Sequence, residues 1–189
     1  MKQETLLPKN ELKYFKKFTH GGVSLKKRRK TKRPLVPGAI THLVLKSSKA
    51  TGTYSFLKNK ALVQSLLRER SRRFFVEILE FVNMGNHLHL KVRFKSTQQF
   101  HNFLRTFAGL LARKLTKAHR GTTFGRFWDG LAYTRVLTSK IEELGLRIYF
   151  KGNAVEIAKG LKAREALLIK WNRYLYRLRA TRAVAAPSG

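Results

Sequence analysis

Between residues 40 and 151 the apolar residues follow two different periods, and the order of these periods constrains the fold more than any other feature. A period of two is typical of a half-buried strand, and steps of three and four are typical of an amphipathic helix. The strand pattern covers 40–45, 74–82, 87–94 and 131–137, and the helical pattern covers about 55–69, 97–118 and 140–151. The order β-α-β-β-α-β, followed by helices, predicts an α+β fold of the ferredoxin-like type, an antiparallel sheet with helices on one face.

The sequence on both sides of this pattern is basic. Residues 1–39 are expected to form an arm, because the run from Lys26 to Arg33 carries seven positive charges in eight residues and cannot fold alone. Residues 40–155 are expected to form the folded domain, and residues 156–189 a basic C-terminal helix and tail.

The charge of the whole chain limits its partners. Lys and Arg number 41 and Asp and Glu number 10, so the formal net charge is +31. Such an excess repels itself unless a polyanion neutralises it, and nucleic acid is the expected partner, with an anionic membrane surface as the alternative. The hydrophobic fraction of 43% is that of a folded domain and argues against general disorder.

Several kinds of site and segment are excluded. The absence of Cys rules out disulfides, thiol nucleophiles and Cys-ligated metals, and the single Asp, Asp129, leaves little for a nuclease site built on clustered carboxylates. No apolar stretch is long enough for a transmembrane helix. The charged start, Met1 to Thr5, is not that of a secretory signal.

Two pairs of residues could carry chemistry. His87 and His89 are two apart on a predicted strand, so their imidazoles leave the same face and can bind one divalent cation. Tyr149 and Asn153 are four apart on a predicted helix and share one of its faces. A phenol can act as a covalent nucleophile and a carboxamide oxygen can complete a metal site, although each pair alone is better explained by packing.

Taken together, these residues resemble a known enzyme family. Asn86-His87-Leu88-His89-Leu90 resembles the His-hydrophobic-His motif of the single-tyrosine HUH transposases. Three later segments resemble the downstream half of the family pattern: Gly125–Trp128, Tyr133–Val136 and Tyr149–Val155. The nearest branch is that of the REP-associated tyrosine transposases, in which a Tyr lies four residues ahead of Asn-Pro-Val. The resemblance covers about residues 40–161.

The resemblance implies a DNA strand transferase and endonuclease that cleaves and rejoins single-stranded, hairpin-flanked DNA through a 5′-phosphotyrosine intermediate. Carried over residue by residue, His87, His89 and Asn153 would bind Mg²⁺ or Mn²⁺, and Tyr149 would be the nucleophile. The implied partner is single-stranded or hairpin DNA and not a membrane. The implied location is the bacterial cytoplasm, in association with the nucleoid, and the resemblance leaves a monomer and a homodimer both open.

A further set of basic and aromatic residues is expected to stack bases and hold phosphates. Trp128 and Tyr133 are equally compatible with a place in the core. The expected DNA-contacting residues are Lys26, Lys27, Arg28, Arg29, Lys30, Arg126, Trp128, Tyr133, Arg135, Arg173 and Arg177.

The sequence also departs from the family pattern. Gly85 and Ala154 stand where the family usually has Pro, so turn and helix-end geometry are expected to differ. The histidines without a partner pattern are interpreted as structural or surface residues: His20, His42, His101 and His119. Two other functions stay open, a catalytically inactive descendant that binds nucleic acid and a basic RNA-binding protein of the ribosomal kind.

Overall fold

The computed structural model describes residues 18–22, 32–120, 122 and 124–184, with side chains described as far as Arg173. The chain divides into two compact units, residues 1–140 and 141–189, and each is described by itself. Within the described residues, no helix is both long and apolar enough to cross a membrane.

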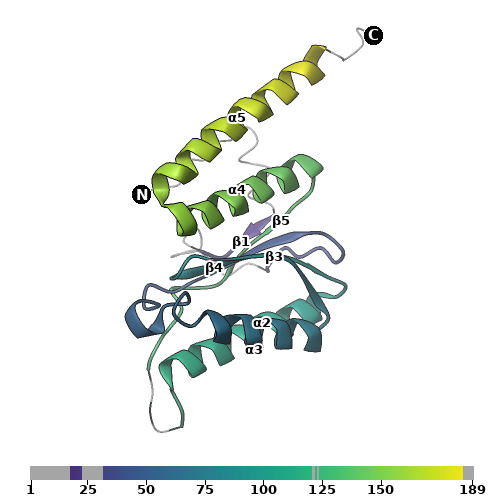
Figure 1. The fold of residues 1–189 in the computed structure, drawn as a ribbon. Helices are drawn as coiled ribbons and strands as arrows, with labels where there is room; N and C mark the ends of the chain where they lie inside the picture. The colour runs from purple at the N-terminus through teal and green to yellow at the C-terminus, as the bar shows by residue number, and fades with distance from the viewer. Residues whose placement is uncertain (1–17, 23–31, 121, 123, 185–189) are drawn as a thin grey trace. The chain divides into compact units, whose positions relative to one another are not determined.

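The first unit is built on a five-stranded antiparallel sheet (Figure 1). Its strands, in the spatial order β1-β5-β2-β4-β3, are β1 (Thr19–His20), β2 (Thr41–Lys46), β3 (Val76–Asn83), β4 (His87–Phe94) and β5 (Tyr133–Val136). β4 lies between β2 and β3 and pairs with both, which is the split β-α-β arrangement. The predicted α+β fold is confirmed, and the sheet gains an edge strand, β1, from the segment expected to be an arm.

Two helices, α2 (Lys60–Arg73) and α3 (Thr97–Thr116), pack on each other and on one face of this sheet (Figure 1). The apolar stripe of α3 forms the centre of the core, and its four most buried residues are Phe100, Phe103, Phe107 and Leu111. Alternate residues of β2 and β4 meet these helices, namely Leu43, Leu45, Leu88, Leu90 and Val92. Burial of each such side chain stabilises the fold by about 1.5–3 kcal/mol.

The helix predicted from about residue 55 begins later, at Lys60. The predicted helix included Leu57 and Phe56, and both lie ahead of the observed one; Leu57 is 42% exposed and Phe56 is fully buried. Phe56 lies in a turn after a short 3-10 helix (Gly52–Tyr54), and its backbone N–H donates to the carbonyl of Gly85 at 2.7 Å. One buried aromatic residue therefore holds the segment out of the helix.

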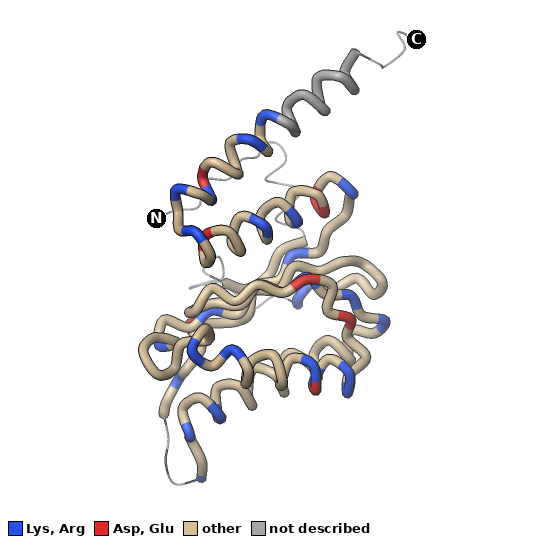
Figure 2. The backbone as a smooth tube through the Cα atoms, viewed as in Figure 1, with Lys and Arg blue, Asp and Glu red and all other residues tan. Residues whose placement is uncertain are grey.

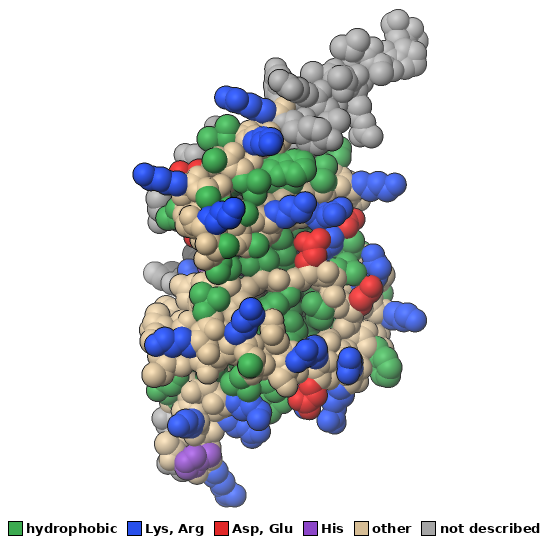
Figure 3. Space-filling model, viewed as in Figure 1, with side chains coloured by type: hydrophobic (Ala, Val, Ile, Leu, Met, Phe, Trp, Pro, Cys, Tyr) green, Lys and Arg blue, Asp and Glu red, His purple; other side chains and the backbone are tan. Residues whose placement is uncertain are grey.

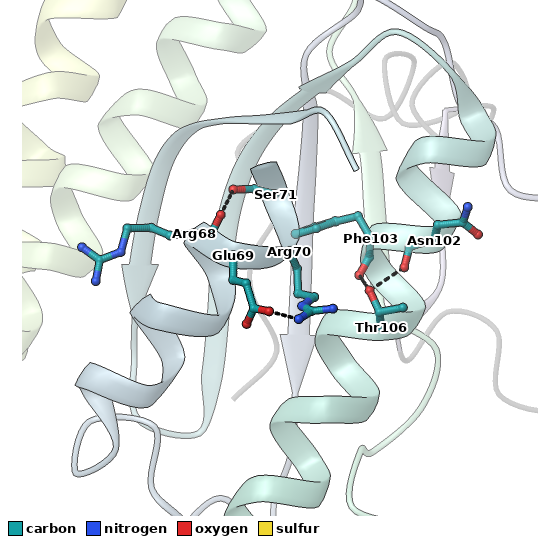
Figure 4. A network of polar contacts seen from close by, with 7 residues as sticks. All are labelled: Arg68, Glu69, Arg70, Ser71, Asn102, Phe103 and Thr106. Atoms are coloured by element: carbon teal, nitrogen blue, oxygen red, sulfur yellow. Dashed lines mark hydrogen bonds and ion pairs between the residues drawn. The ribbon is translucent and has the colours of Figure 1, made fainter. Parts of the chain in front are cut away.

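Several polar contacts of α2 and α3 are made inside the helix to which they belong (Figure 4). Ser71 Oγ donates to a carbonyl of α2, and Thr106 Oγ1 donates to two carbonyls of α3. Glu69, the one acidic residue of α2, forms an ion pair with Arg70. Among the described residues, the other arginines of α2 form no ion pair: Arg68, Arg72 and Arg73.

The turn between β3 and β4 leads directly into the histidine motif. Asn83 donates from Nδ2 to the carbonyl of Phe56 at 2.7 Å and accepts from the N–H of Gly85 at 3.0 Å. Gly85 has a φ of 90°, which proline, with its φ held near −65°, cannot adopt. The glycine at this position therefore gives a turn that differs from one containing the proline usual in the family.

The last residue of the basic run is anchored on the sheet. Arg33 Nη1 donates to the carbonyl of Ala132 at 2.8 Å and to Thr134 Oγ1 at 2.7 Å. Burial lowers the pKa of Arg33 to about 10, so the guanidinium stays charged at neutral pH. Lys26 to Lys30, five residues expected to contact DNA, lie outside the described residues.

The second unit consists of helices α4 (Lys140–Lys159) and α5 (Leu161–Val184). α4 was expected to end near Lys151, but it continues for two more turns because Ala154, unlike proline, donates its backbone N–H and fits a helix. The helix ends at Gly160, which has a φ of 85°. Lys and Arg positions recur along α4 and along the part of α5 whose side chains are described (Figure 2).

Candidate functional site

Two histidines of β4 lie on the face of the sheet that α2 and α3 leave uncovered. The ring centroids of His87 and His89 are 4.8 Å apart, with the ring planes at 79°. Leu88, between them, points into the core and is fully buried. The alternation of the strand thus places both imidazoles side by side.

Each of these two rings has its Nδ1 atom at hydrogen-bonding distance from a neighbour. His87 Nδ1 donates to Asn86 Oδ1 at 2.6 Å. His89 Nδ1 lies 3.1 Å from Nε2 of His42 on β2. An imidazole that carries its proton on Nδ1 presents the lone pair of Nε2, the form in which histidine binds metals.

His42 is the site residue that sequence analysis missed. Its ring stacks on His89, with centroids 5.4 Å apart and planes at 20°, and meets the edge of Tyr133 on β5 at 6.0 Å. Burial, together with the positive charge of Arg135, lowers the pKa of His42 to about 3, so the ring is neutral. Alternation with Leu43 and Leu45 places His42 on the face of the sheet opposite to those leucines, but only the register between β2 and β4 reveals its neighbour.

The charges near these three residues, the histidine cluster (His42, His87 and His89), are mostly balanced within the sheet. Lys91, next along β4 on the same face, is 4% exposed and pairs with Glu80 of β3 at 3.5 Å. Arg135 of β5 lies opposite His42 in the strand register. The cluster therefore lies in a partly desolvated part of the surface, where burial and the charge of Arg135 keep the imidazole of His42 neutral.

Tyr149 and Asn153 lie on α4 in the second unit, one helical turn apart. Asn153 is 1% exposed, and among the described residues neither its Oδ1 nor its Nδ2 has a hydrogen-bond partner. Tyr149 is half-buried, and the guanidinium of Arg164 on α5 lies 5.7 Å from the centre of its ring. Arg164 Nη1 also donates to Glu156 at 2.5 Å, which fixes the guanidinium beside the tyrosine.

The other residues expected to contact DNA have different surroundings. Trp128 packs as a core aromatic, because its ring stacks on Phe56 at 5.7 Å and its Nε1 donates to the carbonyl of Ala108 at 3.2 Å. Arg126 and Arg173 are exposed, and Tyr133 and Arg135 are half-buried on the face of the histidine cluster. Arg177 lies in α5, beyond the last described side chain.

The chemistry of the residues fits a divalent cation. Among the residues that the structure describes, no three His, Cys, Asp or Glu side chains are grouped to hold a metal ion. A metal would therefore need the imidazoles of His87 and His89 and a different kind of third donor. The amide of Asn153, which is buried and has no hydrogen-bond partner among the described residues, is by its chemistry a neutral oxygen donor. Nitrogen and oxygen donors of this kind suit Mn²⁺, with oxygen preferred by Mg²⁺.

Comparison with known proteins relates the first unit to transposases. The family described as "Transposase IS200 like" matches residues 39–142, a range that includes the histidine motif and ends ahead of Tyr149. A solved structure of a REP-associated tyrosine transposase bound to a REP hairpin is similar over 71% of this chain and 76% of its own, with 9% identity and a TM-score of 0.52. A putative transposase from Deinococcus radiodurans R1 is similar over 66% of this chain and 98% of its own, with 15% identity and a TM-score of 0.43. The comparison with curated proteins returned no match.

Proposed function

We propose that this chain, which belongs to the IS200-like transposase family, cleaves and rejoins single-stranded, hairpin-flanked DNA through a covalent bond to Tyr149. The observation that carries the proposal is the orientation of the histidine pair. Both His87 and His89 have Nδ1 beside a hydrogen-bond partner, which holds each ring in one orientation and makes Nε2 the nitrogen that would ligate a cation.

In the proposed reaction the oxygen of Tyr149 attacks a DNA phosphate. A bond forms between this oxygen and phosphorus, and the bond between phosphorus and the 3′ oxygen breaks. The phenol loses its proton to solvent and the 3′ oxygen gains one, so that a 5′-phosphotyrosine and a free 3′-hydroxyl remain. A 3′-hydroxyl then reverses the step, and no nucleotide cofactor is needed because the phosphodiester energy is retained.

His87, His89 and Asn153 would hold Mg²⁺ or Mn²⁺. Bound there, the cation would act as a Lewis acid toward the charge that develops on the phosphate. Asn153 contributes to the proposal because a buried amide without a partner costs about 1–3 kcal/mol, and ligation would offset that cost.

His42 acts in this proposal as a positioning residue. Its neutral ring accepts the Nδ1 proton of His89, which fixes the tautomer and the orientation of the ligand ring. Asn86 has the same role for His87. Each ligand histidine is thus held by one neighbour.

The proposed partner is single-stranded or hairpin DNA. The similar REP-associated transposase is bound to a REP hairpin, and the charge of +31 on this chain suits such a polyanion. Basic side chains are distributed over the visible face of the molecule (Figure 3). Packing removes Trp128 from the proposed contacts, which are the basic arm (Lys26, Lys27, Arg28, Arg29 and Lys30), Arg126, Tyr133, Arg135, Arg173 and Arg177.

The test is covalent trapping of a protein–DNA adduct on a denaturing gel, with structured single-stranded oligonucleotides and Mn²⁺. The wild type should form an adduct that chelator abolishes, and Tyr149→Phe should fold and bind DNA but form none. Tyr54→Phe is the matched control, because it also removes one phenol oxygen but has no Asn four residues later. An adduct in Tyr149→Phe would overturn the nucleophile, and tight DNA binding by a wild type that forms no adduct would favour an inactive descendant.

A further inference from the structure

Phe75, between α2 and β3, has a backbone conformation that is unusual for a large side chain. Its φ is 54°, in the left-handed region that favours Gly and Asn, and its side chain is 74% exposed. Among the described residues it is the most exposed large apolar side chain and the only strongly exposed aromatic one. A bulky residue with positive φ is an outlier that calls for an explanation.

The turn itself does not require an aromatic ring. α2 ends with the N–H of Phe74 donating to the carbonyl of Arg70 at 3.1 Å and that of Phe75 donating to Arg72 at 3.3 Å. A left-handed residue after a helix is ordinarily Gly or Asn, which adopt the conformation at lower cost. Burial of the Phe75 side chain offsets little of the conformational strain, because about three quarters of the residue is exposed to solvent.

The surroundings of Phe75 are strongly basic. Arg68, Arg72 and Arg73 are exposed, and within the described part of the chain none of them has an acidic partner. The nearest acidic residues in the sequence are already paired, Glu69 with Arg70 and Glu77 with Arg93. Arg68 extends away from α3 (Figure 4). An exposed aromatic ring among unpaired arginines is the combination that binds single-stranded nucleic acid, because the ring stacks a base while the cations hold the phosphates.

We propose that Phe75 and the three arginines (the Phe75 platform) bind an unpaired base and the flanking phosphates of single-stranded DNA. The choice of DNA rests on the proposed function. The platform lies at the opposite end of the β3–β4 hairpin from His87, since Val76 pairs with Phe94. At ~3.3 Å per residue, the seven steps from Phe94 to His87 place the platform about 23 Å from His87 along the strand, so it would hold a base that flanks the cleaved position.

The experiment measures the affinity of the full chain for a dT oligonucleotide and for an abasic oligonucleotide of equal length, in chelator so that no cleavage occurs. Phe75→Asn removes the ring and suits the left-handed backbone. It should weaken dT binding about 5-fold to 150-fold and leave abasic binding unchanged, as expected for one lost stacking contact. Its Tm should equal or exceed that of the wild type, because the strain is relieved. Phe75→Gly should behave in the same way.

Lys117→Gly is the matched control, because Lys117 is the other non-glycine residue with positive φ in the described part of the chain, also at a helix end. It should relieve similar strain and keep the preference for dT over abasic DNA. Arg72→Gln with Arg73→Gln should reduce the log–log salt slope for both oligonucleotides by about 1.4.

An unchanged preference for dT over abasic DNA in both Phe75 variants would overturn the proposed platform. A lower Tm in both variants would also overturn it, because the ring would then have a structural role. A stronger preference for oligo(U) would overturn the assignment to DNA. The binding assay does not depend on Tyr149, so a failed adduct assay and a failed platform are distinguishable.

Discussion

The histidine strand β4 and the tyrosine helix α4 differ in how their polar atoms are satisfied. On β4, the Nδ1 atoms of His87 and His89 both lie at hydrogen-bonding distance from side chains of the same unit. On α4, the amide of Asn153 is buried and, among the described residues, has no hydrogen-bond partner at all. One region is therefore oriented before any ligand binds, whereas the other carries an energetic cost that only a ligand or a substitution can remove.

This difference assigns separate tasks to the two regions under the proposed function. A site oriented in advance loses function when its supports are removed, even if the protein remains stable. A site that stores an unsatisfied polar group gains stability when that group is removed, and loses ligand binding. The predictions below test this contrast.

The largest effect is expected for His87→Ala. Loss of a ligand for the cation should slow cleavage by about 10³-fold, because charge neutralisation on the phosphate is worth several kcal/mol. DNA affinity in chelator should change little, since the affinity is carried by the 41 basic residues. Single-turnover cleavage and anisotropy measure the two quantities. His101→Ala is the control, and cleavage by His87→Ala at the wild-type rate would remove the histidine pair from the mechanism.

The next largest effect concerns the support of His89. His42→Phe keeps a ring but cannot accept the His89 proton, so Mn²⁺ affinity without DNA should fall about 10-fold to 100-fold. His42→Gln retains an acceptor oxygen and should lose less. ¹⁵N NMR of the metal-free protein should show His89 protonated on Nδ1 in the wild type and a tautomer mixture in His42→Phe. The same tautomer in both proteins would show that His42 only fills space.

Acid should destabilise the fold through His42. Its pKa is 6.5 when unfolded and about 3 when folded, so its stability contribution is intact above pH 6.5 and is lost as the pH falls toward 3. The groups that face it are His89 of β4 and Tyr133 and Arg135 of β5. Between pH 7.5 and pH 5 the free energy of unfolding should fall by about 2 kcal/mol through this residue. In His42→Phe, the free energy of unfolding measured with urea should fall less between these two pH values, by about 2 kcal/mol. An equal fall in the variant and the wild type would contradict a neutral buried ring.

The smallest effect has the opposite sign. Asn153→Leu replaces the unpartnered amide by an apolar group of similar size and should raise the free energy of unfolding by about 1–2 kcal/mol, while Mn²⁺ no longer stabilises the protein. Asn83→Leu is the matched control, because both polar atoms of Asn83 are hydrogen-bonded. That variant should be destabilised. Equal destabilisation of the two would mean that the Asn153 amide is satisfied in solution.

The parts of this protein that could be predicted from the sequence are those whose structure depends only on the spacing of nearby residues. The stripe of α3, the hairpin of β3 and β4 and the shared face of His87 and His89 all follow from residue spacing. His42 escaped sequence analysis because its partner is 47 residues away and is set by strand register. Trp128 was ambiguous because an aromatic residue in a loop can stack on a base or on a core, and only the position of Phe56 decides between them.

The small β1 strand has a consequence for the integrity of the sheet. Thr19 and His20 pair with Arg135 and Thr134, and the carbonyl of Phe18 accepts from the N–H of Val136 at 3.1 Å. Without this segment β5 would be an edge strand with open hydrogen-bonding groups, the feature through which sheets associate with one another. Two residues near the start of a highly charged chain therefore protect it from self-association, and a shortened protein that begins after Gly22 should aggregate at concentrations at which one that begins before Phe18 stays dispersed.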